Sequence, residues 1–339
     1  MPAPLTVLDT LGRPMRDLRV SVTDRCNFRC GYCMPREVYG PDHAFLPRPE
    51  ILSYEEITRV VRGAVALGVR KVRLTGGEPL VRRNLQTLVG MLAAIDGIDD
   101  LTLTTNATLL AAKAQPLARA GLHRVTVSLD ALDDETFMRM NDARVPVSTV
   151  LDGMAAAIGA GLGPIKLNAV IRRGLNEHAV LDLAERFRGT DTTVRFIEYM
   201  DVGHTNGWRL DDVVPAGEIL STIDARWPLE PVDASYRGEV AQRWRYRDGA
   251  GEIGVISSVT QPFCGDCTRA RLSADGSIYT CLFATAGHDL RPVLRSGADD
   301  AAVADAMRAI WTGRSDRYSE LRTLDTVELP KVEMSFIGG

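Results

Sequence analysis

The sequence predicts an α/β fold, namely a partial (β/α)6 TIM-type barrel followed by a smaller C-terminal α+β domain that carries a second cysteine cluster. Strand-like and helix-like segments alternate from residue 17 to about residue 200, which is typical of parallel strands joined by helical crossovers. After residue 201 this rhythm stops and hairpin-like segments follow. The expected divisions are an N-terminal extension at 1–15, the barrel at 16–200, the second domain at 201–337 and a Gly-Gly tail at 338–339.

The first two β/α units are predicted from local patterns. A strand is expected at 17–23, where β-branched residues alternate in DLRVSVT. A helix begins after Ser53, because Glu56 follows at the spacing of a capping box and apolar residues recur at helical spacing as far as residue 67. From residue 71, KVRLTGGEP predicts a buried strand that runs into a glycine turn, and NLQTLVGMLAAI predicts its helix.

Four further strands and two hairpins complete the prediction. The strands are LTLTTN at 101–106, RVTVSLD at 124–130, IKLNAVI at 165–171 and TVRFIEYM at 193–200. The hairpins are AQRWRYRDGAGEIGVISS and RLSADGSIYTCLF, the second with Asp275-Gly276 as its turn. Ligands of such sheets sit at the carboxyl ends of the strands, so the functional residues are expected there. Residues 201–260 contain no motif to which a function can be assigned.

The composition indicates a cytoplasmic enzyme. The chain has 339 residues, of which 45% are hydrophobic and 25% charged. No apolar run approaches the ~20 residues of a membrane span, so we expect no membrane contact. The net charge of −4 argues against a nucleic-acid binder, because such domains are usually strongly basic.

All six cysteines fall in two triplets, which are Cys26, Cys30 and Cys33 and then Cys264, Cys267 and Cys281. A tetrahedral zinc or a fully ligated [4Fe–4S] cluster takes four protein ligands, so each triplet is one short. If each holds a [4Fe–4S] cluster, one iron of each stays open, one for a cofactor and the other for a substrate. Zinc stays an alternative at the second triplet, because His288 could complete a site of three cysteines and one histidine.

The first triplet resembles the radical S-adenosylmethionine superfamily. The residues that carry the resemblance are CNFRCGYC, directly after the first strand, and GGEP at 76–79. The resemblance implies a [4Fe–4S] cluster on three thiolates, with S-adenosylmethionine chelating the fourth iron. The residues that it implies for the cofactor are Tyr32, Gly76, Gly77, Glu78, Asn106, Ser128 and Met200.

From end to end, the chain resembles the GTP 3′,8-cyclase family of molybdenum cofactor biosynthesis. The motifs are CNFRCGYC, RLTGGEPL, a C-terminal C-x2-C followed by TRARL, a third cysteine and a final Gly-Gly. The resemblance implies a lyase with a second [4Fe–4S] cluster that contacts GTP. A 5′-deoxyadenosyl radical would remove the 3′ hydrogen, and the product would be (8S)-3′,8-cyclo-7,8-dihydroguanosine 5′-triphosphate. Peptide-modifying relatives are the nearest rivals, but they generally carry more C-terminal cysteines.

The resemblance also implies the residues that face GTP. A triphosphate carries about four negative charges, and cations from several strands would converge on it. The implied substrate residues are Arg19, Lys71, Arg73, Thr104, Lys166, Arg195, Arg269, Ala270 and Arg271. Arg19, Gly338 and Gly339 are expected to serve catalysis, Arg19 in the final proton or electron step and the Gly-Gly tail by reaching toward the site.

One position departs from the family pattern. Relatives commonly continue Thr-Asn-Gly, whereas this chain has Asn106-Ala107, so we expect a backbone there that does not need a positive φ. The implied partners are GTP, S-adenosylmethionine, an electron donor and a downstream cyclic pyranopterin monophosphate synthase, and a homodimer is a further expectation. Two alternatives stay open: a non-catalytic iron–sulfur or zinc binding module, and a radical enzyme that acts on a peptide.

Overall fold

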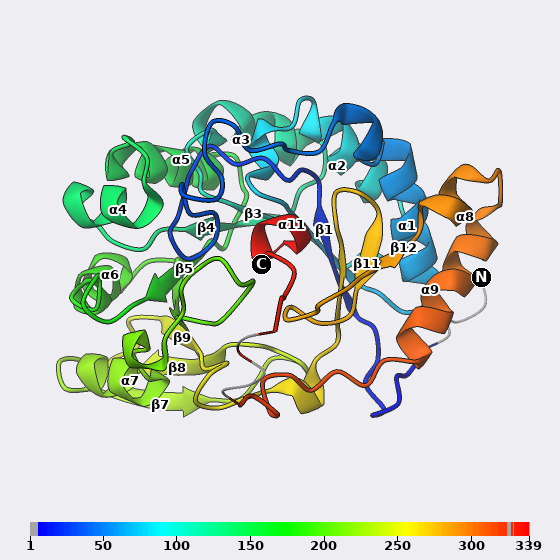
Figure 1. Cartoon of the computed structure of the whole chain (residues 1–339). Coiled ribbons are helices and arrows are strands. Elements are labelled where there is room, and N and C mark those ends of the chain that lie inside the picture. Colours follow the sequence, from blue (N-terminus) through cyan, green and yellow to red (C-terminus); the bar gives the residue numbers. More distant parts are fainter. Residues whose placement is uncertain (1–5, 324–326, 328, 339) are drawn as a thin grey trace.

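The computed structural model describes residues 6–323, 327 and 329–338 (Figure 1). Within these residues a twelve-stranded sheet has the order β12-β11-β10-β1-β2-β3-β4-β5-β6-β9-β8-β7. Its strands are β1 (Asp17–Ser21), β2 (Lys71–Thr75), β3 (Asp100–Thr105), β4 (Arg124–Ser128), β5 (Lys166–Ile171), β6 (Thr193–Glu198), β7 (Leu229–Val232), β8 (Gln242–Tyr246), β9 (Glu252–Ile256), β10 (Arg269–Leu272), β11 (Ser277–Tyr279) and β12 (His288–Asp289).

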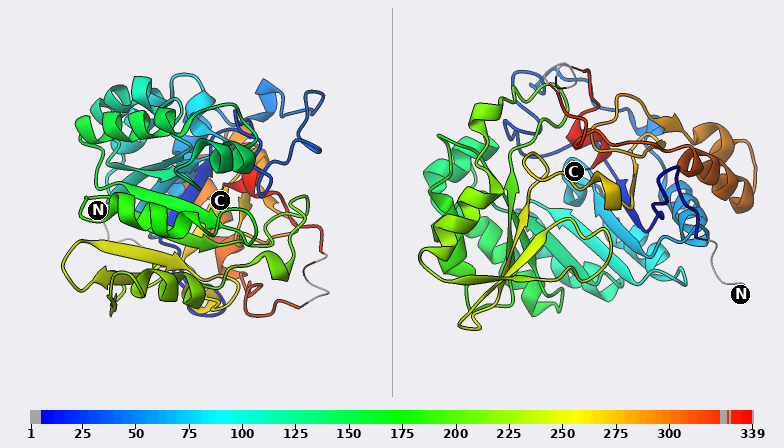
Figure 2. Two further views of the ribbon diagram at one scale, coloured as in Figure 1. Left: turned by 90° about the vertical axis from the view of Figure 1, so that its left-hand side faces the viewer. Right: turned by 90° about the horizontal axis from the view of Figure 1, so that it is seen from below.

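The strands β1 to β6 pair in parallel and in chain order, which confirms the predicted partial barrel. The α-helices are α1 (Tyr54–Ala66), α2 (Leu85–Ala93), α3 (Leu110–Arg119), α4 (Asp134–Asn141), α5 (Val147–Gly159), α6 (Ala179–Phe187), α7 (Ala216–Asp224), α8 (Arg291–Arg295), α9 (Asp300–Thr312) and α11 (Met334–Ile337). Short 3-10 helices span Arg48–Glu50, Pro79–Val81, Leu210–Asp212 and Cys264–Asp266. Figure 2 shows the sheet curved, with the helices of the β/α units on its outer side. None of the described helices is long and apolar enough to cross a membrane.

The first helix begins as the sequence predicts. The Ser53 hydroxyl accepts a hydrogen bond from the Glu56 amide (3.1 Å), and the Ser53 amide donates to the Glu56 carboxylate (2.8 Å). This capping box satisfies amides that have no partner inside the helix. The apolar residues that follow, among them Val60 and Val61, are buried in the core. Burial of this stripe holds α1 against the protein interior.

The strands after residue 201 extend the barrel sheet at both of its edges. Both predicted hairpins are confirmed, since β8 pairs with β9 and β10 with β11 in antiparallel fashion. In addition, β9 lies parallel to β6, and β10 lies parallel to β1. The second of these pairings sets Arg271 beside Arg19 and brings the second cysteine triplet next to the barrel. One sheet therefore joins residues that are far apart in the sequence.

Candidate active site

A cavity of about 280 Å³ lies inside the curved sheet, and all six cysteines line it. It extends from Asp17 and Lys71, where β1 and β2 begin, to the residues that follow the carboxyl ends of the strands. The other predicted site residues that line it are Arg19, Tyr32, Arg73, Gly76, Gly77, Glu78, Thr104, Asn106, Ser128, Lys166, Arg195, Met200, Arg269 and Arg271.

Two of the predicted site residues that the structure describes do not line the cavity. Ala270 is fully buried and belongs to the hydrophobic core, because side chains alternate between the two faces of β10. Gly338 packs against Thr75, which does line the cavity. Gly339 lies outside the described residues.

The first triplet lies in the loop after β1. Turn hydrogen bonds hold this loop, since the amides of Cys33 and Met34 both donate to the Cys30 carbonyl (2.9 and 2.8 Å). Burial raises the pKa of the Cys26 thiol to about 12. Burial also raises the pKa of Cys30, and the nearby thiols of Cys33 and Cys26 raise it further. Burial is the largest cause of the raised pKa at each of the three thiols, and a cationic cluster would stabilise the thiolates.

Two glycines let the GGEP segment lie directly against the cysteine loop. A Cβ atom at Gly76 would lie 2.6 Å from the Thr23 carbonyl oxygen, and one at Gly77 would lie 2.4 Å from that of Arg25. The Gly77 amide donates to the Thr23 carbonyl (2.8 Å). Any larger side chain would separate the two segments, so the glycines fix the position of the first triplet.

The carboxylate of Glu78 is engaged by the protein itself. It accepts hydrogen bonds from the amides of Leu80 (2.9 Å) and Asn106 (2.8 Å) and from the hydroxyl of Thr105 (2.7 Å). Burial raises the pKa of Glu78 to about 7, although these three donors favour the carboxylate. Glu78 therefore links the end of β2 to the end of β3.

The expectation for Ala107 is wrong. Its φ is +62°, in the left-handed region, although it carries a Cβ atom. Its amide donates to the Thr105 hydroxyl (2.9 Å), and its carbonyl accepts from the Leu110 amide (3.0 Å). These contacts at the start of α3 hold the residue in a conformation that costs roughly 1–2 kcal/mol outside glycine. Hydrogen bonds to near neighbours in the sequence thus outweigh the preference of alanine for a negative φ.

The second triplet lies in a more cationic environment. Arg269 donates a hydrogen bond to the Cys267 sulfur at 3.4 Å. Burial alone would raise the pKa of Cys267, but the guanidinium groups of Arg269 and Arg314 outweigh it and lower this pKa to about 6. A thiolate is the form of cysteine that binds metal ions, and the lowered pKa favours this form at Cys267.

The zinc alternative at the second triplet gains no support. His288 is exposed on β12, where it pairs with Ile278, and it does not line the cavity. In the described part of the chain, no group of three or more His, Cys, Asp or Glu side chains is arranged to hold a single metal ion. A [4Fe–4S] cluster has a different requirement, since each thiolate binds a different iron.

Five arginines face the cavity with unused hydrogen-bonding capacity. They are Arg19, Arg73, Arg195, Arg269 and Arg271, and the Nε atom of each is buried without a partner among the described residues. Burial lowers the pKa of Arg19, and the nearby arginines lower it further. A buried donor without a partner costs about 1–3 kcal/mol, and the oxygens of a polyanion would satisfy several of these donors at once.

Several cavity residues were missed by sequence reasoning. Asp130 accepts a hydrogen bond from the Tyr32 hydroxyl (2.8 Å) and another from the Val170 amide (2.8 Å), and burial raises its pKa to about 6. Asp130 ends the predicted strand RVTVSLD, and this position at a strand's carboxyl end could have identified it as a site residue. Tyr236 and Glu239 also line the cavity, but the segment 201–260 that carries them has no motif.

Comparison with family models and solved structures agrees with this architecture. The radical SAM superfamily model matches residues 20–187, and the Molybdenum Cofactor Synthesis C model matches residues 192–320. Streptococcus suis SuiB bound to S-adenosylmethionine has a similar fold, with a TM-score of 0.62 and 15% identity over 94% of this chain and 72% of that chain. Native anSMEcpe with bound AdoMet gives a TM-score of 0.54 and 14% identity, over 84% of this chain and 81% of that one. The fold and the family models define a radical SAM enzyme.

Sequence relatives narrow this class. The GTP 3′,8-cyclase of Acidothermus cellulolyticus is 56% identical and aligns over 98% of this chain and 99% of its own. That of Xanthomonas axonopodis pv. citri is 53% identical over the whole of both chains, and that of Staphylococcus aureus is 47% identical over 98% of this chain and 99% of its own. The chain belongs to the GTP 3′,8-cyclase family.

Proposed function

We propose that this chain converts GTP to (8S)-3′,8-cyclo-7,8-dihydroguanosine 5′-triphosphate, the first step of molybdenum cofactor biosynthesis. One observation carries the proposal: six cysteines and five arginines with unpartnered Nε atoms line the same cavity. The thiols suit iron, and the arginines suit a triphosphate. Family membership over nearly the whole chain supports the same reaction.

The first triplet would hold a [4Fe–4S] cluster with S-adenosylmethionine on its open iron, and this pair, when bound, supplies a radical that removes a hydrogen atom from the substrate. Cys26, Cys30 and Cys33 would be its ligands. The cofactor would lie against the strand ends that carry Ser128 and Met200, beside Tyr32. Asp130 orients the Tyr32 ring through the hydrogen bond to its hydroxyl.

The second triplet would hold a [4Fe–4S] cluster that contacts the guanine of GTP. The arginines of β1, β2, β6 and β10 would bind the triphosphate and ribose, with Lys71 and Lys166 beside them. Anionic oxygens would relieve the repulsion among these cations and satisfy their free Nε donors. Arg73 Nη1 donates to the hydroxyls of Thr104 (3.2 Å) and Thr126 (3.3 Å), and these bonds would orient Arg73 for this task.

The remaining chemistry depends on positioning. Binding the guanine at one end and the phosphates at the other would bend the nucleotide, so that C3′ and C8 approach each other. Arg19 lies between Arg73 and Arg271 on neighbouring strands and is our candidate for the final proton or electron step. The Gly-Gly tail would complete the site from the side of Thr75.

Several finer points rest on the family resemblance. We propose an electron donor for the first cluster, a downstream cyclic pyranopterin monophosphate synthase, a cytoplasmic location and a homodimer. We also propose that the chain divides into an N-terminal extension at 1–15, a barrel domain at 16–200, a second domain at 201–337 and a Gly-Gly tail at 338–339.

The test is anaerobic turnover of the reconstituted chain with GTP deuterated at C3′, S-adenosylmethionine and a strong reductant. We expect deuterium in the 5′-deoxyadenosine, read by mass, since the radical would take the 3′ hydrogen. Unlabelled 5′-deoxyadenosine would indicate that the hydrogen atom comes from another substrate, as in a peptide-modifying enzyme. Absence of 5′-deoxyadenosine from a fully iron-loaded chain would favour the binding-module alternative.

A further inference from the structure

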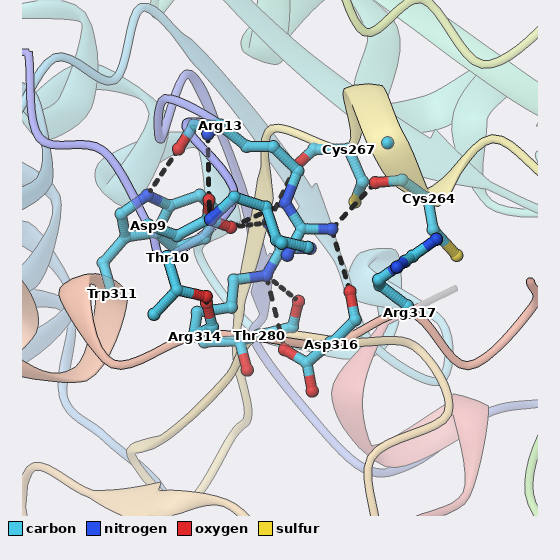
Figure 3. Close-up of polar contacts among 12 residues, drawn as sticks. Asp9, Thr10, Arg13, Cys264, Cys267, Thr280, Trp311, Arg314, Asp316 and Arg317 are labelled. Carbon is cyan, nitrogen blue, oxygen red and sulfur yellow. Dashed lines mark hydrogen bonds and ion pairs between the residues drawn. The ribbon is translucent and has the colours of Figure 1, made fainter. Parts of the chain in front are cut away.

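The N-terminal segment 6–15 lies outside both matched family ranges, yet it takes part in a buried ion network beside the second triplet (Figure 3). The Asp9 carboxylate accepts from Arg13 Nε at 2.6 Å and from Arg314 Nη1 at 3.1 Å. None of these three side chains exposes more than 2% of its surface. Two arginines from opposite ends of the chain therefore share one carboxylate.

Both arginines also hold the backbone that carries the thiols. Arg13 Nη1 donates to the Cys264 carbonyl, and Arg314 Nη1 donates to the Cys267 carbonyl, each at 2.8 Å. Arg314 Nε donates to the carbonyl of Thr280, which precedes Cys281, at 3.1 Å. All three segments of the second triplet are thus tied to one network.

Further contacts fix the two arginines in place. The Trp311 indole donates to the Arg13 carbonyl (3.0 Å), and the Thr10 hydroxyl donates to the Arg314 carbonyl (2.6 Å). The Arg314 guanidinium lies 4.6 Å from the centre of the Trp311 ring. The network therefore joins the N-terminal segment to the end of α9 and the residues that follow it.

Stability alone is a weak explanation for this arrangement. Buried ion pairs often add little to stability, because desolvation offsets their attraction. The two arginines instead donate hydrogen bonds to the carbonyls of Cys264, Cys267 and Thr280, all in the second triplet's segments. Arg314 also lines the cavity. Partners that fix metal ligands typically alter metal affinity by roughly 10–100-fold, and nearby charge shifts the potential of an iron–sulfur cluster.

We propose that Asp9, Arg13 and Arg314 are positioning residues of the second cluster, which hold Cys264, Cys267 and Cys281 at the spacing of a cluster. The positive charge of Arg314 also favours the reduced state and raises the reduction potential. This inference rests on the proposed function, because it requires an iron–sulfur cluster at the second triplet.

The test compares Arg314→Gln and Arg314→Lys in the full-length reconstituted chain. Arg308→Gln is the matched control, since Arg308 lies on α9 but pairs with Asp305 on the surface. Iron release to a chelator and the EPR spectrum of the reduced protein are followed, and addition of S-adenosylmethionine identifies the signal of the first cluster. We expect Arg314→Gln to release the second cluster's iron about tenfold faster and to lower its midpoint potential. Arg314→Lys should have the midpoint potential of the unmodified chain, because the positive charge is kept. It should still release iron faster, because lysine lacks the guanidinium fork.

A second measurement needs no bound cluster, so it also applies to variants that lose their iron. In the metal-free chain, the rate of maleimide modification is read cysteine by cysteine for Arg13→Lys and Asp9→Asn. We expect faster modification of Cys264 and Cys267, with no change at Cys26, Cys30 and Cys33. The same measurement decides the case if Arg314→Gln does not fold.

The outcomes separate the inference from the proposed function. If the unmodified chain bound about four irons instead of about eight, it would hold one [4Fe–4S] cluster, and the proposed cluster at the second triplet would be wrong. About eight irons in the unmodified chain, with unaltered retention, potential and thiol reactivity in the variants, would overturn the positioning role alone.

Discussion

Gly338 lies directly against the side chain of Thr75: a Cβ atom added to this glycine would lie 2.2 Å from the Thr75 methyl carbon. Gly338 has a φ of +73°, and Thr75 lines the cavity at the end of β2. Upstream, Lys331 pairs with the buried Asp201 (3.3 Å) and Glu333 pairs with His204 (3.1 Å). The described end of the chain is therefore anchored beside the candidate site, where Figure 1 shows α11 close to β1.

We predict that Gly338→Ala lowers the rate of GTP cyclisation by about 100-fold or more, while both clusters are retained. The added methyl group cannot fit against Thr75, so the tail must leave its position. Gly207→Ala is the control, since Gly207 has a similar φ of +61° but open space around it. Deletion of Gly338 and Gly339 should match Gly338→Ala. Full turnover in the truncated chain, measured beside its iron content, would contradict this prediction.

Replacement of a cavity arginine should weaken substrate binding without weakening the fold. Arg271→Met removes a buried cation whose pKa is lowered by burial and by Arg269. We expect the Kd for GTP to rise about 100-fold, since charge-assisted hydrogen bonds contribute about 1.5–3 kcal/mol. The free energy of unfolding of the substrate-free chain should rise by about 1 kcal/mol.

Calorimetric titration with GTP and urea unfolding check the two parts separately. Arg173→Met serves as the control, because Arg173 pairs with Glu218 on the surface and should change neither quantity by more than about 0.5 kcal/mol. Unaltered GTP affinity in Arg271→Met would show that Arg271 does not bind the substrate.

Substrate binding should take up a proton at Lys166. Burial, together with the charge of Arg195, lowers the pKa of Lys166 to about 7 from a usual 10.5. The folded chain thus holds fewer protons than the unfolded chain between these two values, and this group's contribution to stability increases as the pH rises from 7 to 10.5. A bound triphosphate would raise the pKa again, so at pH 8 GTP binding should take up about one proton.

Titration calorimetry in two buffers with different ionisation enthalpies measures this uptake. Lys166→Gln should abolish it, and in the unmodified chain it should disappear at about pH 6, where the amine is already protonated. Equal proton uptake by Lys166→Gln would assign the proton to another group.

Close packing of α5 against Ala107, which precedes α3, gives a prediction about stability. A Cβ atom at Gly153 of α5 would lie 2.4 Å from the Ala107 carbonyl oxygen, whereas one at Gly159 of the same helix meets nothing within 4 Å. Gly153→Ala should lower the free energy of unfolding by about 2 kcal/mol, because the backbone must move. Gly159→Ala should raise it by up to about 1 kcal/mol. Equal urea midpoints for the two variants would show that α5 can shift away without cost.

The local features of the fold were predictable because they depend on neighbours in the sequence. The capping box at Ser53 and Glu56 forms as predicted, and so does the turn at Asp275-Gly276 between β10 and β11. The cysteine triplets and GGEP indicated the superfamily for a similar reason, since loop geometry and ligand spacing are set within a few residues.

Other features followed from contacts between distant segments. The segment 201–260 has no motif, yet it supplies Tyr236 and Glu239 to the cavity. The role of Glu78 as a link to β3 likewise depends on a neighbouring strand, because its carboxylate accepts from the amide of Asn106.

By itself, the sequence determined the six β/α units, the two sets of three thiols and the family to which the chain belongs. Only the tertiary structure decided which residues meet. It aligned Arg271 with Arg19 by pairing β10 with β1, and it tied Asp9 to Arg314 across the length of the chain. The physical reason is that strand pairing and burial act between segments distant in sequence, whereas periodicity and capping act within one segment.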